Sequence, residues 1–434
     1  MTMNASGDIF DPGALLMEGS RIAYVGPQEG APEIIDAEIR DVRDHVVMPG
    51  LVNVHTHACM NLFRGLADDA PRGTWLSDYI WPLDARVTPD DLKTAALAAC
   101  YEMLRNGVTC VADRYAHMDA IVDAFVESGI RAVVTTSLLD VGRRPELDKA
   151  EALISRWGVT GENRISAGFG PHATDTCSTE LLRTIRRLAD DTGAKMFIHV
   201  AQSQEEVDAV RARGAMGAVS YLYDIGFLGP DVIAAHCLYV TTEEVSLLAG
   251  TGTHVAHCPV SNAKIEARIA PVDEMVRAGV SMALGTDCAP SNNGMDLFQE
   301  MRCAALLGKV QSADPMFLPA EEVVRLATSK AAQVLGLEQR IGSLEVGKRA
   351  DVITIRTRSL HVQPWNNPYG NLVYCCTGQD VDDVFVDGEA IVSGGTVEGV
   401  RIDDLIARMR RITGERGLRD VTRRAMTGEG PQAR

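Results

Sequence analysis

Four histidines and one aspartate stand at the ends of apolar stretches of the sequence. They are His55 and His57 in LVNVHTH, His199 in MFIHVA, His236 in VIAAHC and Asp287 in MALGTD. Imidazole nitrogens combined with a carboxylate oxygen form a mixed ligand set that suits Zn²⁺, with Fe²⁺ or Mn²⁺ as alternatives. A metal of this kind with one open position acidifies a water molecule and so supports hydrolysis. The residues therefore predict one divalent metal ion held for hydrolytic chemistry.

The spacing of the first two histidines is by itself a weak signal. Residues two apart on a strand point to the same face, so His55 and His57 can both face inward, but histidines spaced in this way are often structural. His254 and His257, in HVAHCP, illustrate the structural case, and we assign no metal role to them. The stronger argument is that polar residues end several successive strands, because such ends meet at one mouth of a barrel.

Eight apolar stretches alternate with predicted helices in the middle of the chain. They are LVNVHTH, VTCVAD, IRAVVTTSL, ISAGFGPH, MFIHVA, VIAAHC, HVAHCP and MALGTD. Continuous apolar strands separated by helices are typical of a parallel sheet buried on both faces. Capping residues and glycines delimit helices near residues 88–107, 178–193, 242–250 and 271–279. The pattern predicts an α/β fold, a (β/α)8 TIM barrel over residues 49–347, with a doubly wound sheet as the alternative.

Both ends of the chain have a different pattern, with short strand-like segments and turns. The segments are ALLMEG, SRIAYVG and IRDVRDHVVMPG at the start and DVITIRT, LVYCC, VDDVFVDG and EAIVSGG towards the end. We expect residues 1–48 and 348–398 to form one small β-sandwich domain. Residues 399–434 are charged and helical in pattern and predict a C-terminal helical tail.

The composition restricts the range of partners and locations. The chain has 434 residues and a formal net charge of −17 without a basic run, which argues against nucleic acid or an anionic membrane as the main partner. No apolar stretch approaches the roughly 20 residues that span a bilayer, and no signal peptide is visible. Ten scattered cysteines are typical of a reducing compartment. We expect a cytoplasmic protein that acts on a small molecule, with exposed barrel helices available for a homo-oligomer.

Several motifs resemble a known family. PGLVNVHTH is similar to the amidohydrolase superfamily. Within it, the motifs resemble the branch of S-adenosylhomocysteine and methylthioadenosine deaminases and triazine chlorohydrolases. These motifs are HTHACMNLFRGLADD, WLSDYIWPLD, GPHATDTCS, HCPVSNAKI, GTDCAPSNNGMDLFQEMR and LVYCCTGQDVDDVFVDG. The resemblance runs from about residue 10 to about residue 395. It implies His55, His57, His199 and Asp287 as metal ligands and a purine, pterin or triazine as the substrate.

The same resemblance implies roles for further residues. His236 would hydrogen-bond the attacking water or the displaced group, and Asp287 would take the proton of that water. His172 would contact the substrate ring. Asp84 stands where nucleoside deaminases of this branch carry a glutamate that binds ribose hydroxyls. Trp75 forms either an apolar wall for an aromatic substrate or the packing of a loop helix. The wall is favoured, because this segment follows the first strand and should overhang the mouth.

The sequence departs from the family pattern most clearly at Gln202. Deaminases of this type carry H-x-x-E after the fifth strand, and the glutamate transfers a proton to the ring and the leaving amine. Glutamine can hydrogen-bond a ring nitrogen or carbonyl, but it cannot deliver a proton. Glu206 matches a helix position of the motif, so a shift in register does not supply the missing acid.

Two arginines form further departures. Arg114 follows the second strand at a position that often lines the substrate pocket, whereas Arg268 replaces a usual glycine and either projects into the mouth or lies on its rim. Two arginines near the mouth would suit a substrate with an anionic group.

Three functions are compatible with these residues. The first is an aminohydrolase, or deaminase, of an N-heterocycle. The second is a hydrolase that cleaves a cyclic amide-like C–N bond or displaces a group other than ammonia, because neither reaction needs a protonated ring. The third is a homologue that binds metal and ligand without catalysis. The complete ligand set favours the two enzymes.

Overall fold

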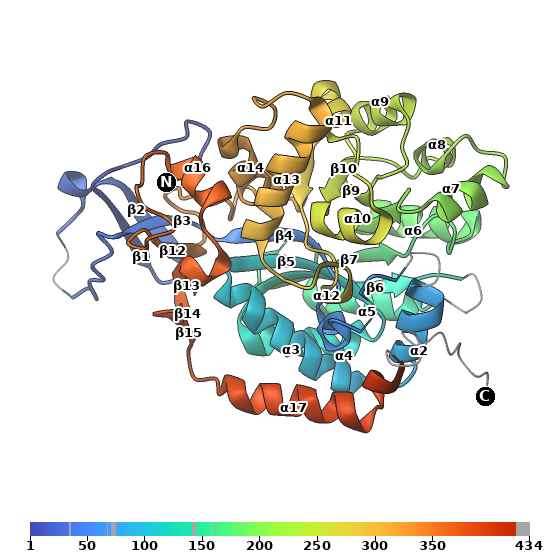
Figure 1. The fold of residues 1–434 in the computed structure, drawn as a ribbon, viewed down its shortest axis with the longest axis horizontal. Coiled ribbons are helices and arrows are strands. Elements are labelled where there is room, and N and C mark those ends of the chain that lie inside the picture. Colours follow the sequence, from blue (N-terminus) through green and yellow to red (C-terminus); the bar gives the residue numbers. More distant parts are fainter. Residues whose placement is uncertain (34–35, 67, 71–74, 141–144, 160, 422–434) are drawn as a thin grey trace.

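The computed structural model describes residues 1–33, 36–66, 68–70, 75–140, 145–159 and 161–421, and its centre is an eight-stranded parallel barrel (Figure 1). The strands are β4 (Leu51–Thr56), β5 (Val108–Tyr115), β6 (Arg131–Leu138), β7 (Ile165–Pro171), β8 (Met196–Val200), β9 (Val232–His236), β10 (His254–His257) and β11 (Met282–Leu284). Each strand pairs with its neighbour along the chain from β4 to β11. The predicted TIM barrel is therefore confirmed. The doubly wound alternative is wrong, because its strand order would reverse at a switch point.

The first and last strands meet at the mouth of the barrel. The backbone amide of Asp287 donates a hydrogen bond to the carbonyl of His55 at 2.9 Å, and Thr56 forms a parallel bridge with Asp287. Gly285 permits this approach, because a Cβ atom there would lie 2.7 Å from the Cβ of His55. A larger residue at position 285 would push apart the two strands that carry His55, His57 and Asp287.

Helices surround the barrel and connect its strands (Figure 1). After β4 come η2 (Ala58–Phe63), the π-helix η3 (Trp75–Ile80), α2 (Trp81–Asp84) and α3 (Pro89–Arg105). The others are α4 (Met118–Ser128), α5 (Leu147–Trp157), α6 (Thr179–Thr192), α7 (Gln204–Arg211), α8 (Ala218–Asp224), α9 (Thr242–Thr251), α10 (Pro259–Glu266), α11 (Val272–Ala278), α12 (Ala289–Asn292), α13 (Leu297–Ser312), α14 (Ala320–Leu326) and α15 (Ser329–Val334). The four helices expected from their capping signals are present as α3, α6, α9 and α11. Thr88 caps α3 through a reciprocal pair of hydrogen bonds with Asp91.

Both ends of the chain build antiparallel sheets beside the barrel (Figure 1). The two-stranded sheet contains β1 (Gly13–Glu18) and β2 (Arg21–Pro27), and the five-stranded sheet contains β3 (His45–Pro49), β12 (Val352–Arg356), β13 (Val381–Val386), β14 (Glu389–Ser393) and β15 (Thr396–Val397). Short 3-10 turns lie at η1 (Gln28–Gly30) and η4 (Gly378–Asp380). Ile22 of the small sheet packs in one apolar cluster with Val352 and Phe385 of the larger sheet. The two ends of the chain therefore share an apolar layer, as the sequence predicted.

One predicted strand, LVYCC, is wrong. Residues Pro368–Tyr374 form helix α16, which includes the first part of this stretch. The side chain of Asn367 accepts a hydrogen bond from the amide of Gly370 at 3.1 Å, and Pro368 occupies the first helical turn. Both are signals for the start of a helix. A short apolar stretch without this context does not distinguish a strand from a helix.

The C-terminal helix α17 (Ile402–Glu415) lies against α3 (Figure 1). Its buried residues Leu405 and Ile412 face the molecule, and the Arg416 guanidinium that follows contacts Asp91 at 2.7 Å. Residues 422–434 of the expected helical tail lie outside the described residues. Among the helices that the structure describes, none combines the length and the apolar character needed to cross a membrane.

Candidate active site

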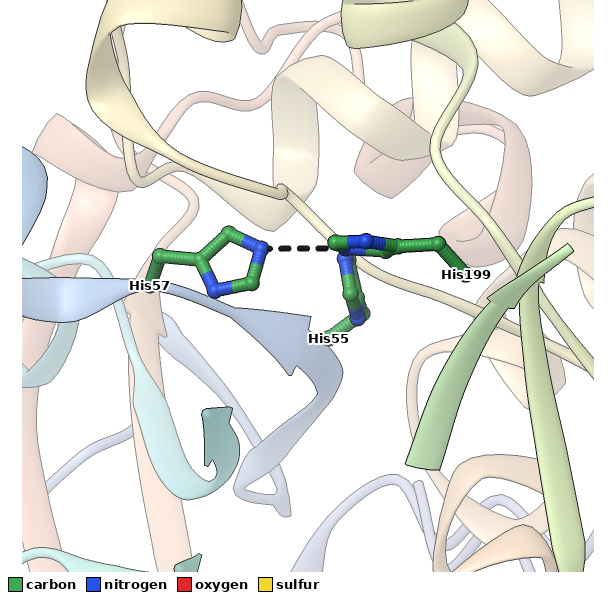
Figure 2. Close-up of side chains that lie close together, drawn as sticks. All are labelled: His55, His57 and His199. Carbon is green, nitrogen blue, oxygen red and sulfur yellow. Dashed lines mark hydrogen bonds between the residues drawn. The ribbon is translucent and has the colours of Figure 1, made fainter. Parts of the chain in front are cut away.

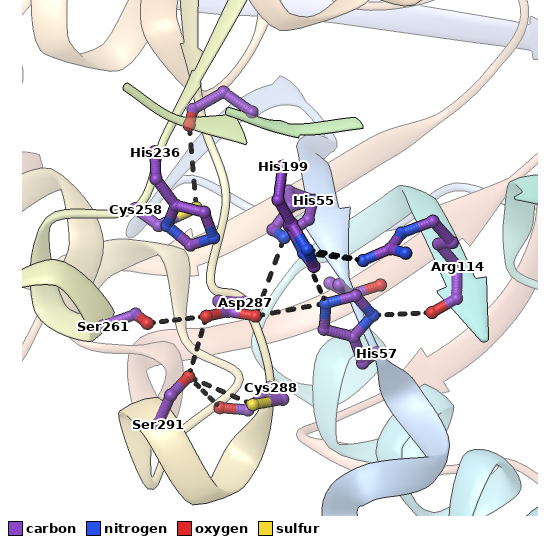
Figure 3. A network of polar contacts seen from close by, with 12 residues as sticks. His55, His57, Arg114, His199, His236, Cys258, Ser261, Asp287, Cys288 and Ser291 are labelled. Carbon is purple, nitrogen blue, oxygen red and sulfur yellow. Dashed lines mark hydrogen bonds and ion pairs between the residues drawn. The ribbon is translucent and has the colours of Figure 1, made fainter. Parts of the chain in front are cut away.

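Five side chains from the ends of four barrel strands converge at the mouth (Figure 3). Nitrogen atoms of His55, His57 and His199 lie within 4.8 Å of one another (Figure 2), and ligand atoms of His55, His236 and Asp287 form a second group of the same size. All five side chains are buried. The structure thus brings together the residues that the sequence placed at the ends of separate strands.

The backbone is strained at the same strand ends. Ala201, His236, Cys237 and Asp287 have positive φ angles of 50°, 75°, 47° and 60°. A residue other than glycine in this region costs on the order of 1–3 kcal/mol and persists only where the surrounding fold enforces it. Strain of this kind gathers at functional sites, so it points to this mouth independently of the side chains.

Backbone and amide groups orient two of the histidines. The Nδ1 of His57 lies 2.6 Å from the carbonyl oxygen of Arg114, and the Nδ1 of His236 lies 2.9 Å from Oδ1 of Asn262. Because both partners are acceptors, each Nδ1 carries the hydrogen and a neutral ring keeps its lone pair on Nε2. The Nε2 of His57 lies 3.3 Å from the Nε2 of His199, so this atom of His57 faces the cluster.

Asp287 is held by contacts at both carboxylate oxygens (Figure 3). Its Oδ1 lies 3.4 Å from Nε2 of His57 and 3.7 Å from Nε2 of His55, whereas its Oδ2 accepts hydrogen bonds from the hydroxyls of Ser261 at 2.6 Å and Ser291 at 3.0 Å. Burial by itself raises the pKa of Asp287, but the neighbouring histidines and the Ser261 hydroxyl outweigh burial and hold this pKa well below its usual range. The carboxylate is therefore ionised near neutral pH.

The protonation of the histidines suits a metal. Burial lowers the pKa of His57 to about 4 and lowers those of His55 and His199 well below the usual value, so all three rings are neutral near pH 7. Among the described residues, the buried Nε2 of His55 has no hydrogen-bond partner. Neutral imidazoles that converge with one ionised carboxylate are the donor set that Zn²⁺ prefers. The residues present therefore fit a divalent metal ion.

A sequence model of the amidohydrolase family matches residues 46–391 of the chain. The chain belongs to the amidohydrolase family. This assignment confirms the resemblance seen in the sequence, and the amidohydrolase barrel described above agrees with it.

Curated relatives and a solved structure narrow the comparison. The 5-methylthioadenosine/S-adenosylhomocysteine deaminase of Moorella thermoacetica is 40% identical over 409 residues, which cover 94% of this chain and 96% of the relative. The 5'-deoxyadenosine deaminase of Methanopyrus kandleri is 42% identical over 392 residues, 89% of this chain and 91% of the relative. A crystal structure of an adenosine deaminase from Xanthomonas campestris with bound zinc superposes with a TM-score of 0.92 at 32% identity, covering 96% of each chain. The expected class, a deaminase-like hydrolase of this family, is confirmed.

Of the five residues expected to contact substrate, His172 lies beside the histidine cluster, and Asp84 and Trp75 are linked to its surroundings through neighbouring residues. His172 follows β7, and its ring centroid lies 5.2 Å from that of His199. Asp84 ends α2 and accepts a hydrogen bond at 2.6 Å from the hydroxyl of Tyr115, whose ring centroid lies 6.5 Å from that of His57. Trp75 is buried in an apolar cluster that includes Cys288, the residue after Asp287. The substrate roles of these residues stay predictions.

Gln202 lies in the turn between β8 and α7, half-buried at the mouth. Its backbone amide donates a hydrogen bond to Oε2 of Glu206 at 2.8 Å, and the amide of Ala201 donates to Oε1 at 3.0 Å. The hydroxyl of Thr174 also donates to Oε1 at 2.5 Å. Glu206 is therefore engaged in holding the turn, and burial raises its pKa to about 7.

The two arginines that depart from the family pattern occupy different environments. Arg114 is buried, and its guanidinium points into the mouth beside His199 (Figure 3). Burial lowers the pKa of Arg114 to about 10, so this side chain is still charged at neutral pH. Arg268 is exposed and stacks on Tyr239, with its guanidinium carbon 4.4 Å from the ring centroid. Of the two alternatives for Arg268, the structure favours the rim.

Several polar residues that support the site were not predicted from the sequence. They are Ser261, Asn262 and Ser291, which bond Asp287 or His236 from helices α10 and α12. Asp113, at the end of β5, accepts hydrogen bonds from the Thr56 hydroxyl at 2.7 Å and from the Ala58 amide at 2.6 Å. For Ser261, Asn262 and Ser291 the available signal was their position four to seven residues after a strand end, within motifs that already matched the family.

Proposed function

We propose that this protein is a metal-dependent aminohydrolase that releases ammonia from an N-heterocycle of the purine nucleoside kind. The observation that carries the proposal is the convergence of His55, His57, His199 and Asp287 at one mouth, in a chain about 40% identical to deaminases of adenosine derivatives. The identity extends over nearly the whole length of those relatives, so it includes the loops that build the pocket.

These four residues would hold the metal, and we propose zinc, with Fe²⁺ or Mn²⁺ as alternatives. The donor set of neutral imidazoles and one carboxylate supports zinc, as does the zinc in the related crystal structure. When bound, the ion acidifies a water molecule so that hydroxide is available near neutral pH.

The chain's own residues would then position the reactants and move protons. Asp287, ionised and held by Ser261 and Ser291, would accept the proton of the attacking water. His236, fixed by Asn262, would present Nε2 to the group that develops at the attacked carbon. His172, together with Trp75, would contact the heterocycle.

Two further residues would bind the substrate without moving protons. Asp84 would accept hydrogen bonds from sugar hydroxyls, and its contact with Tyr115 ties it to the rim of the site. Gln202 would hydrogen-bond the heterocycle through its amide. The proton that the leaving amine requires would return from Asp287, since glutamine has none to give.

Gln202 also favours a second candidate function. A reaction that needs no ring protonation, such as cleavage of a cyclic amide-like C–N bond or displacement of a better leaving group, loses nothing when the acid of the H-x-x-E motif is absent. This second candidate uses the same metal and the same Asp287.

One experiment separates these functions. The zinc-loaded protein is incubated with a panel of purine nucleosides, pterins, triazines and cyclic amides, while ammonia and the ultraviolet spectrum are followed together. Ammonia released in step with the spectral change supports the deaminase. A spectral change without ammonia supports the second candidate. Ligands that raise the melting temperature without any reaction support a binding protein that has lost catalysis.

We propose that residues 1–48 and 348–398 act as one domain around the barrel of residues 49–347, followed by a tail at 399–434. All ten cysteines are free thiols, which supports a cytoplasmic location. A homo-oligomer formed through the barrel helices is testable by light scattering.

A further inference from the structure

The side chain of Arg114 is buried inside the barrel mouth, where neighbouring residues leave space for it. The residue lies near the end of β5 and is 3% exposed. Its Nη1 donates a hydrogen bond to the hydroxyl of Ser137 at 3.1 Å. Gly170 on β7 leaves the space, because a Cβ atom there would lie 2.9 Å from the Cδ of Arg114. The long cation is therefore accommodated by its neighbours.

The carboxylates of Asp287 and Asp113 act on the charge of Arg114 only from beyond contact distance. Within the part of the chain that the structure describes, no carboxylate lies at ion-pair distance from its guanidinium, and its buried Nε has no hydrogen-bond partner. Arg131 provides the contrast, because it is equally buried but contacts the carboxylates of Asp351 and Asp387. A buried charge without a carboxylate in contact is unfavourable, so an anion bound next to Arg114 would be stabilised.

The remaining contact of Arg114 competes with metal binding. Its Nη2 lies 2.7 Å from Nε2 and 3.0 Å from Nδ1 of His199. The same Nε2 faces the Nε2 of His57 at 3.3 Å and so points into the proposed ligand group. A nitrogen lone pair that coordinates a metal ion cannot also accept a hydrogen bond from Arg114. With the site loaded, Nη2 and Nε of Arg114 thus have N–H groups to donate and a charge to neutralise.

We infer that Arg114 binds a negatively charged oxygen of the substrate, next to His199. This inference rests on the proposed function and narrows its substrate class to N-heterocycles that carry a carboxylate or an ionised ring oxo group. The planar guanidinium can donate to such an oxygen through Nη2 and Nε at once. Arg268 does not share this role, because it is exposed and stacked on Tyr239.

The test measures binding to the zinc-loaded protein by calorimetry, with two matched pairs of ligands near neutral pH. Orotate against uracil tests a carboxylate, and urate against hypoxanthine tests an ionised ring oxo group. We expect the wild type to bind the anion of at least one pair at least about 10-fold more tightly than its neutral partner, and the pair that shows the preference identifies the source of the charge. Equal binding within both pairs would overturn the inference.

Variants assign the preference to one residue. Arg114→Gln is expected to remove it, with a loss of about 10–100-fold for the anion and little change for the neutral ligand. Arg114→Lys keeps the charge and should retain part of the preference, and the control Arg268→Gln should retain all of it. Zinc content, measured in every variant, shows that the metal site is intact. A preference that survives Arg114→Gln, or that disappears in Arg268→Gln, would contradict the inference.

A crystal structure of the zinc-loaded wild type with the preferred anion covers the case in which Arg114→Gln does not fold. The anionic oxygen should lie at hydrogen-bond distance from Nη2 or Nε of Arg114, and an anion bound elsewhere would refute the assignment. Ammonia release is measured separately on the same protein. If the protein prefers anions through Arg114 but releases no ammonia, the inference about Arg114 stands and the proposed deaminase function is wrong. If it releases ammonia but shows no preference for anions, the deaminase function stands and the inference about Arg114 is wrong.

Discussion

The carboxylate of Glu206 accepts a hydrogen bond from the backbone amide of Gln202 at 2.8 Å. This bond, together with the one from the amide of Ala201, fixes the turn that directly follows the strand carrying His199. Glu206, four residues after the position where H-x-x-E carries its glutamate, thus supports the backbone of the turn. Its two oxygens are already occupied by three donors.

Replacing Glu206 with glutamine tests this support. The amide group of glutamine cannot accept all three hydrogen bonds, so one buried donor loses its partner, which costs about 1–3 kcal/mol. We expect Glu206→Gln to lower the free energy of unfolding in urea by this amount near pH 5. Glu205, exposed on the same helix, provides the control, because Glu205→Gln should change stability by less than about 0.5 kcal/mol.

The stability difference between wild type and Glu206→Gln should depend on pH. Burial raises the pKa of Glu206 from 4.5 to about 7, so the folded state binds a proton that the unfolded state releases above pH 4.5. The wild type therefore loses stability relative to the variant as the pH rises from about 4.5 to about 7, and the difference between them narrows. Urea unfolding at several pH values measures this trend. A difference that widens over the same range would show that the buried carboxyl is already ionised at low pH.

Gln202→Glu restores the missing proton donor of the family motif. With an uncharged adenine nucleoside as the substrate, we expect ammonia release to rise by about 10²–10⁴-fold, the usual contribution of general acid catalysis. Gln202→Met has a side chain of similar length that cannot donate a proton, so its rate of ammonia release should not rise. An unchanged rate in Gln202→Glu would indicate that the side chain at position 202 does not reach the heterocycle.

Metal content distinguishes the clustered histidines from the structural ones. We expect the wild type to retain about one zinc ion per chain after dialysis and His57→Asn to lose it, because a ligand atom is removed from the cluster. His254→Asn is the matched control, since His254 is also buried but begins β10 at the far end of the barrel and bonds the carbonyl of Pro230. Elemental analysis of the three proteins gives the result. Equal zinc in His57→Asn and wild type would place the metal elsewhere.

The barrel and the cluster could be predicted from the sequence because both depend on periodic, local signals. Eight apolar stretches with polar ends predict parallel strands, and strand ends in a barrel meet by geometry alone. The LVYCC stretch was less informative, because short apolar stretches occur in both strands and helices. Its helix is determined by Asn367 and Pro368, upstream of the apolar residues.

The supporting residues of the site could not be predicted in the same way. Ser261 and Ser291 bond Asp287 only because two separate helices, α10 and α12, point their first turns at one carboxylate. The difference between Arg114 and Arg268 likewise depends on their neighbours. Gly170 opens space for Arg114 inside the mouth, whereas Tyr239 offers Arg268 an aromatic face on the rim. Neither relationship follows from local sequence patterns.

A buried arginine joins the barrel to the small domain. Arg131, at the start of β6, donates hydrogen bonds from Nε and Nη2 to the carboxylate of Asp351 at 2.8 and 2.9 Å, and from Nη2 to Asp387 at 2.7 Å. Arg131→Met leaves Asp351 buried without its cation, which costs about 3–5 kcal/mol. Denaturant unfolding should show this loss, and Arg183→Met, at an exposed position on α6, should show almost none. In Arg131→Met/Asp351→Leu both charges are absent, so we expect part of the stability to return. A double variant less stable than Arg131→Met would mean that Asp351 contributes through contacts other than Arg131. One such contact is the hydrogen bond that Asp351 accepts from the backbone amide of Asp387 at 2.9 Å.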